Sequence, residues 1–566
     1  MLWLGALVFL PLTLPYRSLP LTNFYHDAVA YFLAAAGAAW FLGSAERGSI
    51  RSLHVPCVAV APLALLGVLV VQQLLVMIEY LQHFVVPAFA LLVTALSLTV
   101  GFRVLRPQMR AALTAICWAI VAAAFVNAIW GAVQMAGYEV ARFELLRRGD
   151  VAFRVSGLLA QPNQLATLCA LACVAVVYLW QRKTVSPWLA ASLALVFTCV
   201  AITTGSKSAY LYFPLIGCGL SWVASKSGRS SIWWLPGAWG LAYVPLAASL
   251  DSWLAALFGA RGLEVDRSLT GSSTAARLAF LADGWELFTR APLLGHGWHE
   301  FTAARWRLPE PTFQELHADH AHNAVIHLLA ETGLVGLLAV GLPLLFWLRR
   351  ATAVPAVDPE RVAALAFLSV VAVYSLLEFP LWLGHFLVPT ALLIGMLETR
   401  GLRFEVTTAF SRLARTAVLL MPLAVITAAL DYARTERVFH SLMDGEPKHR
   451  FTAQQIAELS ASTLFRREAE IAFVLSAPVD AAHAALNLDL SERVFLLWPV
   501  AQPASLYAAY LLYAQRGEEA MHVIARTCAW SEKECGTLRS VFASLAEKDG
   551  QPFAGFYARA FGSPGR

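Results

Sequence analysis

Residues 323–350 read NAVIHLLAETGLVGLLAVGLPLLFWLRR, a long apolar run that ends in two arginines. An α-helix needs about 20 mostly apolar residues to cross the hydrocarbon core of a bilayer, so this run predicts a transmembrane helix. Basic residues concentrate in the loops that stay in the cytoplasm. Arg349 and Arg350 therefore mark the cytoplasmic end of the predicted helix.

The same pattern recurs along the chain, which has 566 residues, 58% of them hydrophobic and 14% charged. A soluble domain carries about 25% charged residues, and a mean hydropathy of +0.62 excludes a soluble protein with one anchor. Runs of spanning length occupy 1–16, 25–43, 55–76, 81–101, 111–136, 158–180, 186–203, 208–224, 231–250, 323–348, 362–380, 381–398 and 414–431. The first run is short, and a tight turn near Pro380 must separate the two runs at 362–398. The sequence predicts an all-α, polytopic membrane protein with about 12–13 transmembrane helices.

Basic residues give these helices a consistent orientation. The loops that carry them hold Arg47 and Arg51; Arg103, Arg106 and Arg110; Arg182 and Lys183; Lys226 and Arg229; Arg349, Arg350 and Arg361; and Arg400, Arg403, Arg412 and Arg415. If the runs alternate strictly across the membrane, these six loops fall on one side, which the positive-inside bias makes cytoplasmic. The long loop at 251–322 and the tail at 432–566 then lie on the translocated side.

Two domains follow from this arrangement. Residues 1–431 form a transmembrane domain that includes the long loop 251–322, and residues 432–566 form a helical domain on the translocated side. The tail is balanced in charge, and four stretches in it look helical: 453–462, 481–488, 505–515 and 518–527. Successive paired helices are typical of tetratricopeptide-type domains, although no clean repeat is present.

The chain contains eight cysteines and no CxxC pair, which excludes zinc-finger and thioredoxin-type readings. Six of them lie in or beside apolar runs, where cysteine behaves as a small packing residue. Cys528 and Cys535 lie in the polar tail instead. In an oxidising compartment they can form a disulfide, and the alternative is two free thiols.

Arginines on the translocated side run against the topological bias. The loop at 138–157 holds four of them, and the long loop holds six arginines and no lysine. The guanidinium fork binds phosphate in a bidentate manner, so this distribution favours anion binding. The alternative for each arginine is a salt bridge to a nearby acid such as Glu139, Glu144 or Asp150.

The segment HADHAHN, residues 317–323, leads into the apolar run at 323–350. A neutral imidazole at the boundary between membrane and water can accept a proton from a hydroxyl nucleophile. One alternative is a helix entry, in which Asp319 or Asn323 caps the helix and the histidines are solvated. Another is a metal site formed by its histidines together with His296 and His299, although their spacing matches no zinc signature.

The segment RVSGLLAQPNQ, residues 154–164, leads from the charged loop into the run at 158–180. Pro162 suits the start or a kink of a helix. Gln161, Asn163 and Gln164 place three amides in the upper part of this helix. They either bind substrate or form hydrogen bonds between helices.

Three further polar residues stand at the ends of spans. Lys207 is the only charge in TTGSKSA, residues 203–209, a short turn between two runs. It can neutralise a phosphate or extend to the interface. Arg277 opens an amphipathic stretch of the long loop, and Glu378 lies at the translocated end of the run at 362–380. Glu378 can orient a cation or a hydroxyl, or can pair with an arginine.

Taken together, these residues suit the chemistry of a diphosphate leaving group. His322 supplies a base for the incoming hydroxyl. The cations Arg154, Lys207 and Arg277 offset the charge that develops as a glycosyl–phosphate bond breaks. No Asp-rich motif for a divalent ion stands near these spans, so we expect protein cations to replace a metal, and no other cofactor.

Four segments resemble a known family: HAHNAVIHLLAETGLVG (320–336), GLLAQPNQLAT (157–167), RAPLLGHGW (290–298) and YSLLEFPLWLGHFL (374–387). They are similar to the bacterial O-antigen ligase and polymerase superfamily, and within it to the O-linked protein (pilin) glycosylation ligases. That branch has a helical periplasmic C-terminal domain, to which 432–566 would correspond.

The resemblance implies a metal-independent glycosyltransferase of the bacterial inner membrane, with its active site facing the periplasm. It would move a glycan from undecaprenyl diphosphate to an acceptor hydroxyl. His322 would be the essential histidine, and Arg154, Lys207 and Arg277 would grip the diphosphate. We add to the substrate-binding set Gln161, Asn163, His320 and Glu378.

This chain departs from the family at two positions. Lys207 stands where the family often has arginine, so the charge is kept and the bidentate fork is lost. Tyr374 stands where the family often has histidine.

The first hypothesis is a ligase that acts on a lipid A–core sugar, in lipopolysaccharide biosynthesis, or on a protein Ser/Thr of a pilin-type acceptor. The alternatives are an O-antigen polymerase, which extends a glycan still on its lipid, and a transporter. A transporter would show inverted repeats, and no convincing repeat is visible. We expect membrane lipids around the protein and no nucleic acid among its partners.

Overall fold

The computed structural model describes residues 1–44, 52–141, 144–147, 154–227, 234–257, 272–309, 318–353, 358–443, 453–476, 479 and 481–562. The chain divides into two compact units. Unit 1 comprises Met1–Gly67, Ala88–Gly271 and Leu338–Ala429, and unit 2 comprises Val68–Pro87, Ser272–Leu337 and Leu430–Arg566. The predictions about some residues concern positions outside the described ranges, namely Arg47, Arg51, Asp150, Arg229 and His317 and the loop arginines Arg142, Arg148, Arg261 and Arg267.

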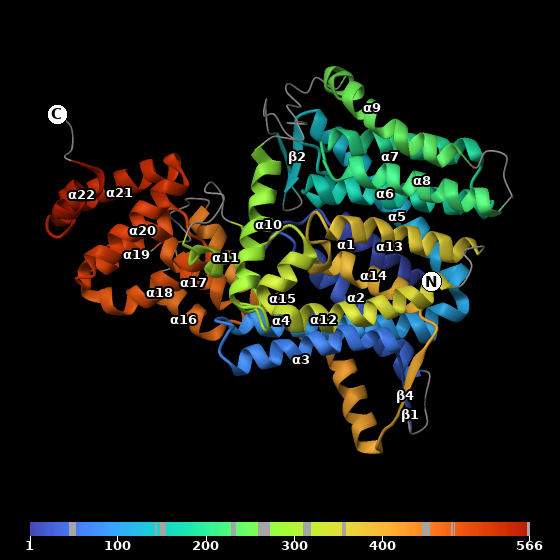
Figure 1. Ribbon diagram of the computed structural model, residues 1–566, viewed down its shortest axis with the longest axis horizontal. Helices are drawn as coiled ribbons and strands as arrows, with labels where there is room; N and C mark the ends of the chain where they lie inside the picture. The colour runs from blue at the N-terminus through green and yellow to red at the C-terminus, as the bar shows by residue number, and fades with distance from the viewer. Residues whose placement is uncertain are drawn as a thin grey trace. The chain divides into compact units, whose positions relative to one another are not determined.

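A helix coincides with each of the predicted apolar runs (Figure 1). These helices are α1 (Leu2–Thr13), α2 (Phe24–Ser44), α3 (Val60–Leu74), α4 (Leu81–Val100), α5 (Met109–Met135), α6 (Pro162–Gln181), α7 (Pro187–Thr203), α8 (Ala209–Ser227), α9 (Leu235–Leu257), α12 (Ala324–Ala353), α13 (Pro359–Ser375), α14 (Gly384–Leu397) and α15 (Thr408–Met443). Within the described residues, 5 helical stretches are long and apolar enough to cross a membrane. They are Cys57–Leu74, Leu81–Met135, Pro162–Gln181, Ala324–Ala353 and Thr408–Ser441. The all-α, polytopic membrane class is confirmed.

Two expected loops have regular structure. A π-helical turn (Gly101–Leu105) and a 3-10 turn (Arg106–Gln108) continue α4 into α5, where a loop was predicted. Gly101 packs so closely on α14 that an added Cβ would lie 2.3 Å from the backbone oxygen of Leu392, and this packing keeps the segment ordered. In the 138–157 loop, β2 (Tyr138–Ala141) and β3 (Glu144–Arg147) form an antiparallel hairpin.

The turn near Pro380 is confirmed. α13 ends at Ser375, a 3-10 turn covers Pro380–Trp382, and α14 begins at Gly384. Proline is favoured at such a position because it cannot donate a helical hydrogen bond. It also disfavours helical conformation in the residue before it. The short turn predicted at 203–209 is also present, between the ends of α7 and α8.

Several of the basic loops of unit 1 meet one another. β1 (Ser52–Pro56) pairs with β4 (Gly401–Glu405) in an antiparallel ladder, which joins the loops after α2 and α14 (Figure 1). Arg350 Nη2 lies 2.6 Å from Glu398 Oε2, and Arg182 Nη2 lies 2.7 Å from Glu360 Oε1. These contacts place loops that were predicted to share a side of the membrane on one face of unit 1.

α6 connects that face to the opposite end of unit 1. It runs from Pro162 to Gln181 between α5, α7, α8 and α13, and most of its side chains are buried. Nineteen residues separate Asn163 from Arg182, a rise of about 28 Å in an α-helix. This is close to the thickness of the hydrocarbon core, about 30 Å. Polar residues at the start of α6 therefore lie one membrane thickness from the basic loops.

In unit 2, the segment after α10 (Ser272–Arg290) interlocks with a kink in α12. Gly333 has φ +62° and ψ −165°, so α12 is two helices joined at this residue. The Leu334 N–H donates to Pro292 O at 2.8 Å, and the Gly297 N–H donates to Glu331 O at 3.0 Å. A Cβ on Gly333 would lie 2.3 Å from the backbone of Leu293. The RAPLLGHGW and ETGLVG sequences thus form one close backbone contact.

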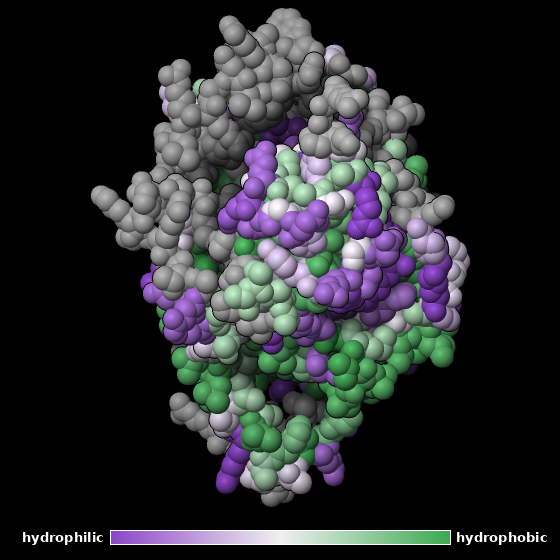
Figure 2. Space-filling view, turned by 90° about the vertical axis from the view of Figure 1, so that its left-hand side faces the viewer, coloured by the Kyte–Doolittle hydropathy of each residue, from purple (hydrophilic) through white to green (hydrophobic). Residues whose placement is uncertain are grey.

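The C-terminal helices of unit 2 pack each against the next in sequence. They are α16 (Ala453–Ser462), α17 (Arg466–Ser476), α18 (Ala484–Leu497), α19 (Ala501–Tyr513), α20 (Gly517–Trp530), α21 (Glu532–Asp549) and α22 (Phe553–Phe561). Cys528 and Cys535 form a disulfide between α20 and α21, which decides between the two alternatives left by the sequence. Figure 2 shows hydrophilic side chains gathered on the face that these helices present.

Candidate functional site

In unit 1, two amides of α5 fix the chain that leads into α6. Gln134 Oε1 accepts the N–H groups of Ser156 and Gly157, at 3.1 and 2.8 Å. Asn127 Oδ1 accepts the Leu158 N–H at 2.9 Å. Gly157 has φ +62°, and a Cβ there would lie 2.5 Å from Asn127 Oδ1. The buried amides therefore satisfy backbone donors that a non-helical entry would otherwise leave unpaired.

Asn163 is the centre of a polar cluster at the start of α6. Its side chain is buried, and its Oδ1 accepts from Arg154 Nη2 at 3.2 Å and from Ser206 Oγ at 2.8 Å. Its Nδ2 donates to Glu378 Oε1 at 2.8 Å. The structure thus joins Arg154 and Asn163, which belong to one segment, to Glu378, which lies 215 residues beyond Asn163.

The turn that carries Lys207 adjoins this cluster. Arg154 Nε donates to Thr204 O at 2.7 Å, and the Val155 N–H donates to Thr203 O at 3.2 Å. Lys207 is half-buried three residues after Thr204. Within the described residues, Gln161 does not join this cluster through a hydrogen bond but caps α6, because its Oε1 accepts the Gln164 N–H at 2.8 Å. The hydrogen bond that caps a helix explains a polar residue at this position.

A second polar line in unit 1 was not predicted from the sequence. His385 is buried in α14, and its Nδ1 lies 2.8 Å from Asp27 Oδ1 while its Nε2 lies 3.3 Å from Gln164 Oε1. Asp27 and His385 stand 358 residues apart. The only sequence signal was a histidine within the apolar segment YSLLEFPLWLGHFL. Gln164 follows Asn163, so both polar lines meet at the start of α6.

In unit 2, His322 precedes Asn323, the residue immediately before the start of α12. Its backbone is left-handed, with φ +52°, which is uncommon for a residue other than glycine. Asn323 Oδ1 accepts the N–H groups of Val325 and Ile326, at 3.0 and 3.1 Å. The His322 ring stacks on Phe280 of α10 with 5.9 Å between ring centres. Asn323 is therefore the helix cap, and His322 is the half-buried side chain that it presents.

Arg277 lies one helical turn before Phe280 on α10 and is half-buried. Residues three apart are neighbours on a helix surface, so Arg277 and the ring against His322 share one side of α10. His322 and Arg277 belong to unit 2, whereas Arg154, Lys207 and Glu378 belong to unit 1. Their convergence around one substrate stays a prediction.

His320 belongs to a line of ionisable side chains behind His322. Its Nδ1 lies 2.6 Å from Asp319 Oδ1, and its ring lies 5.0 Å from the ring of His327. His327 Nε2 lies 3.4 Å from Glu331 Oε2, one turn further along α12. His327 and Glu331 were not among the predicted site residues, although their spacing of four on a helix was a readable signal.

Two further described histidines of the long loop, His296 and His299, lie against other parts of unit 2. His299 is half-buried and lies against His83, with 4.9 Å between ring centres. Burial, together with the nearby charge of Arg467, lowers the pKa of His299 well below its usual value. His296 Nε2 lies 2.9 Å from Leu287 O. Among the described residues, no three His, Cys, Asp or Glu side chains form a group that could hold a metal ion.

A family of known proteins matches the part of the chain that carries most of these residues. Residues 155–341 match a family model described as O-antigen ligase. This part of the chain is similar to O-antigen ligases. Within it lie Asn163, Lys207, Arg277, His320 and His322, and Arg154 immediately precedes it. The family resemblance drawn from the sequence motifs is confirmed.

Two further matches extend beyond residues 155–341. Residues 362–534, which include Glu378 and His385, match a family model described as the C-terminal part of the virulence factor membrane-bound polymerase. The general O-oligosaccharyltransferase of Acinetobacter baylyi (strain ATCC 33305 / BD413 / ADP1) is 23% identical to this chain over 251 residues. The aligned stretch covers 43% of this chain and 43% of that protein, so the chain matches less than half the length of this relative.

Proposed function

We propose that the protein is a membrane glycosyltransferase that moves a glycan from undecaprenyl diphosphate to an acceptor hydroxyl. The observation that carries the proposal is the O-antigen ligase match over 155–341, which spans the cluster at Asn163 and the histidine segment ending at His322. The two family models are described as an O-antigen ligase and a membrane-bound polymerase, and the relative as an O-oligosaccharyltransferase. The transporter alternative has no such support.

The reaction exchanges one bond for another at the first sugar of the glycan. The acceptor oxygen forms a bond to the anomeric carbon, and the bond from that carbon to the phosphate oxygen breaks. His322 takes the proton from the acceptor hydroxyl, and the electron pair of the broken bond leaves with undecaprenyl diphosphate. Arg154, Lys207 and Arg277 stabilise the diphosphate charge as it develops. Glu378 acts on Arg154 through Asn163, whose amide contacts both side chains.

The active site faces the periplasm of a bacterial inner membrane in this proposal. The basic loops that meet on one face of unit 1 favour a cytoplasmic location for that face. The Cys528–Cys535 disulfide favours an oxidising compartment for the tail. The polar start of α6 is at the opposite end of that helix from Arg182, on the side where donor and acceptor would meet.

The acceptor is a lipid A–core sugar or a protein Ser/Thr, for example of a pilin. The relative is described as a general O-oligosaccharyltransferase, which favours the protein acceptor. The polymerase alternative is favoured by the description of the model matched at 362–534. Mass spectrometry of glycolipids and pilin in a deletion strain separates these cases. A ligase predicts unmodified acceptor with intact lipid-linked glycan, whereas shortened glycan on the lipid would contradict the ligase and support the polymerase.

The proposed orientation predicts which engineered cysteines an impermeant thiol reagent can reach. Leu278 is exposed on α10, and Arg403 is exposed on β4. In intact spheroplasts, Leu278→Cys should react above the wild-type background and Arg403→Cys should not. After lysis both should react. The opposite pattern, with only Arg403→Cys labelled before lysis, would invert the orientation.

The proposed mechanism predicts transfer that survives chelation. The positive charge at the diphosphate comes from Arg154, Lys207 and Arg277, so no step depends on a metal. Glycan transfer by purified protein should therefore be the same with and without EDTA. Activity that EDTA abolishes and zinc or magnesium restores would contradict the prediction and revive a histidine metal site.

A further inference from the structure

α11 (Phe301–Trp306) is a six-residue helix in which every residue is buried. It lies in the long loop, between α10 and the segment that contains His322. Thr302 Oγ1 donates to Ala318 O at 3.1 Å, four residues before His322. Arg305 Nε lies 2.6 Å from Asp283 Oδ2 of α10, and both side chains are fully buried. α11 therefore fixes both the helix and the loop that flank His322.

The contact from α11 to His322 passes through one aromatic ring. The guanidinium carbon of Arg305 lies 4.8 Å from the centre of the Phe280 ring. Phe280 in turn stacks on the His322 imidazole. An arginine held by a buried carboxylate has little freedom to move, so the Asp283–Arg305 pair fixes Phe280, and Phe280 fixes the plane of the His322 ring.

The next residue of α11 points into the C-terminal helices. Trp306 belongs to their hydrophobic core, where its ring meets Phe495 of α18 edge to face with 4.7 Å between centres. Arg526 of α20 lies 4.7 Å from the Trp306 ring centre and donates to Leu308 O. Adjacent residues of one short helix thus contact the His322 environment and the core of the C-terminal helices.

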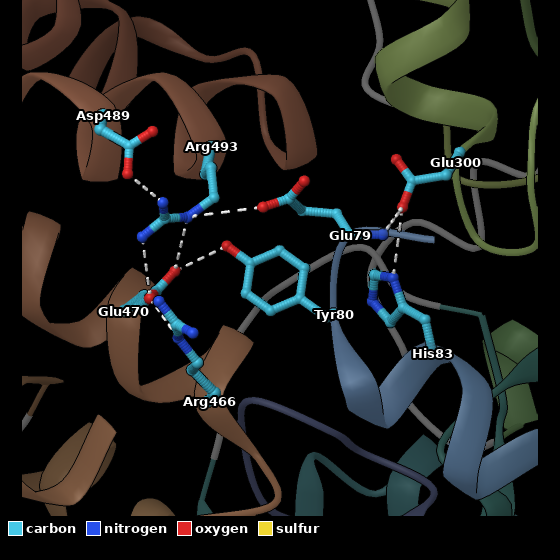
Figure 3. Close-up of polar contacts among 8 residues, drawn as sticks. All are labelled: Glu79, Tyr80, His83, Glu300, Arg466, Glu470, Asp489 and Arg493. Atoms are coloured by element: carbon cyan, nitrogen blue, oxygen red, sulfur yellow. Dashed lines mark hydrogen bonds and ion pairs between the residues drawn. The ribbon is translucent and has the colours of Figure 1, made fainter. Parts of the chain in front are cut away.

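A second set of contacts, here called the second tie, connects the start of α11 to the C-terminal helices. It passes through residues 79–83, which lie just before and at the start of α4 (Figure 3). Tyr80 donates to Glu470 Oε2 of α17 at 2.7 Å, and Glu470 also pairs with Arg493 of α18 at 3.1 Å. On the other side, the Glu79 N–H donates to Glu300 Oε1 at 3.2 Å, and His83 Nδ1 lies 3.6 Å from the same oxygen. Glu300 immediately precedes α11, so this tie acts on the same short helix.

The pKa of the Tyr80 hydroxyl agrees with a lasting hydrogen bond between Tyr80 and Glu470. Burial and the neighbouring Glu470 carboxylate raise the pKa of the Tyr80 hydroxyl, so this group remains a donor to that carboxylate. Gln82 reinforces the contact, because its Nε2 donates to Glu468 at 2.9 Å and its Oε1 accepts the Arg467 N–H at 3.1 Å. The Tyr80 hydroxyl and both polar atoms of the Gln82 side chain are therefore hydrogen-bonded, as buried polar groups require.

We propose that the C-terminal helices position the His322 imidazole, with Trp306 and Arg305 of α11 as the link. The inference rests on the proposed function, in which His322 is the base. It adds that the C-terminal helices act on turnover itself, besides any part in acceptor binding. Trp306, Arg305 and Phe280 are positioning residues in this account, because none of them needs to touch the substrate.

Two phenylalanines of one core provide a matched test. Phe495 and Phe542 are both fully buried in the core of the C-terminal helices. Phe495 contacts the ring of Trp306. The ring of Phe542 instead packs near those of Phe553, Phe556 and Phe561. Phe495→Leu and Phe542→Leu remove the same atoms from the same core, so we expect similar losses of thermal stability.

The two variants should differ in turnover. Misplacing a catalytic group by about 1 Å can cost about 100-fold in rate, and a change transmitted through two rings should cost about 10-fold. Phe495→Leu should lower kcat by about this factor with an unchanged KM for the acceptor, and Phe542→Leu should leave kcat unchanged. Trp306→Phe, which keeps an aromatic ring at the contact, should keep more turnover than Trp306→Leu. Equal kcat for Phe495→Leu and Phe542→Leu, or a change in KM alone, would overturn the proposal.

A double variant separates this inference from the proposed function. If Phe495 acts through His322, adding Phe495→Leu to His322→Ala should cause no further loss, because the two changes share one pathway. An additional 10-fold loss in the double variant would contradict positioning through His322. Wild-type transfer by His322→Ala alone would instead overturn the proposed base, and with it the proposed function of the histidine segment.

Discussion

His322→Ala is expected to lower the rate of glycan transfer by about 10²–10⁴-fold, the usual contribution of a general base. Binding of the lipid diphosphate should change much less, because the imidazole acts on the acceptor hydroxyl. The cap at Asn323 holds the backbone next to His322 in place independently of the His322 ring. The variant should therefore fold.

The measurement is glycan transfer and donor binding, each determined separately on purified, folded protein. His522→Ala is the matched control, because His522 is an exposed histidine of α20. It should transfer glycan at the wild-type rate. If His322→Ala also does so, the base is elsewhere, and His320 or Glu378 becomes the next candidate.

Arg277→Ala is expected to weaken both donor binding and turnover, with turnover falling by about 10²–10³-fold. A guanidinium at the diphosphate acts in the ground state and again as charge develops on the leaving group. Arg277→Lys should restore only part of the loss, because a point charge replaces a bidentate fork.

Arg290 provides the control on the same helix. It is exposed at the end of α10 and pairs with Glu286 at 2.8 Å, a surface ion pair that contributes little. Arg290→Ala should bind donor and transfer glycan as the wild type does. Equal behaviour of Arg277→Ala and Arg290→Ala would show that Arg277 does not contact the diphosphate.

The membrane architecture could be predicted from the sequence because each span must carry its own apolar run. α6, α12 and α13 begin and end within a few residues of the predicted runs. The link from α4 to α5 could not be predicted. Its arginines are typical of a loop, and the helical turns there depend on Gly101 packing against α14.

The candidate site could be predicted in part. Motifs at the ends of spans identified Arg154, Asn163 and Glu378, and the structure joins them directly. The Asp27–His385–Gln164 line depends on contacts between residues more than 200 positions apart, and no local pattern predicts such pairing. Gln161 was predicted to bind substrate, and its side chain caps α6. A substrate role for this residue stays a prediction.

The C-terminal domain shows the same limit. Helices lie at the four stretches expected in the tail, with α16 at 453–462 as predicted, whereas α17, α21 and α22 were not predicted. Trp306 could not be assigned to their core, because it lies in the long loop and nothing local distinguishes it from a residue at the membrane surface. The units defined by contacts likewise combine Val68–Pro87 and Ser272–Leu337 with the tail, whereas sequence reasoning divides the chain into consecutive ranges.

The most direct test of the proposed function is the mass of a defined acceptor after incubation with the purified protein and a defined undecaprenyl-diphosphate-linked oligosaccharide. The account predicts that the acceptor gains the mass of one intact glycan, with an equal amount of undecaprenyl diphosphate released. An unchanged acceptor accompanied by longer glycans on the lipid carrier would contradict it.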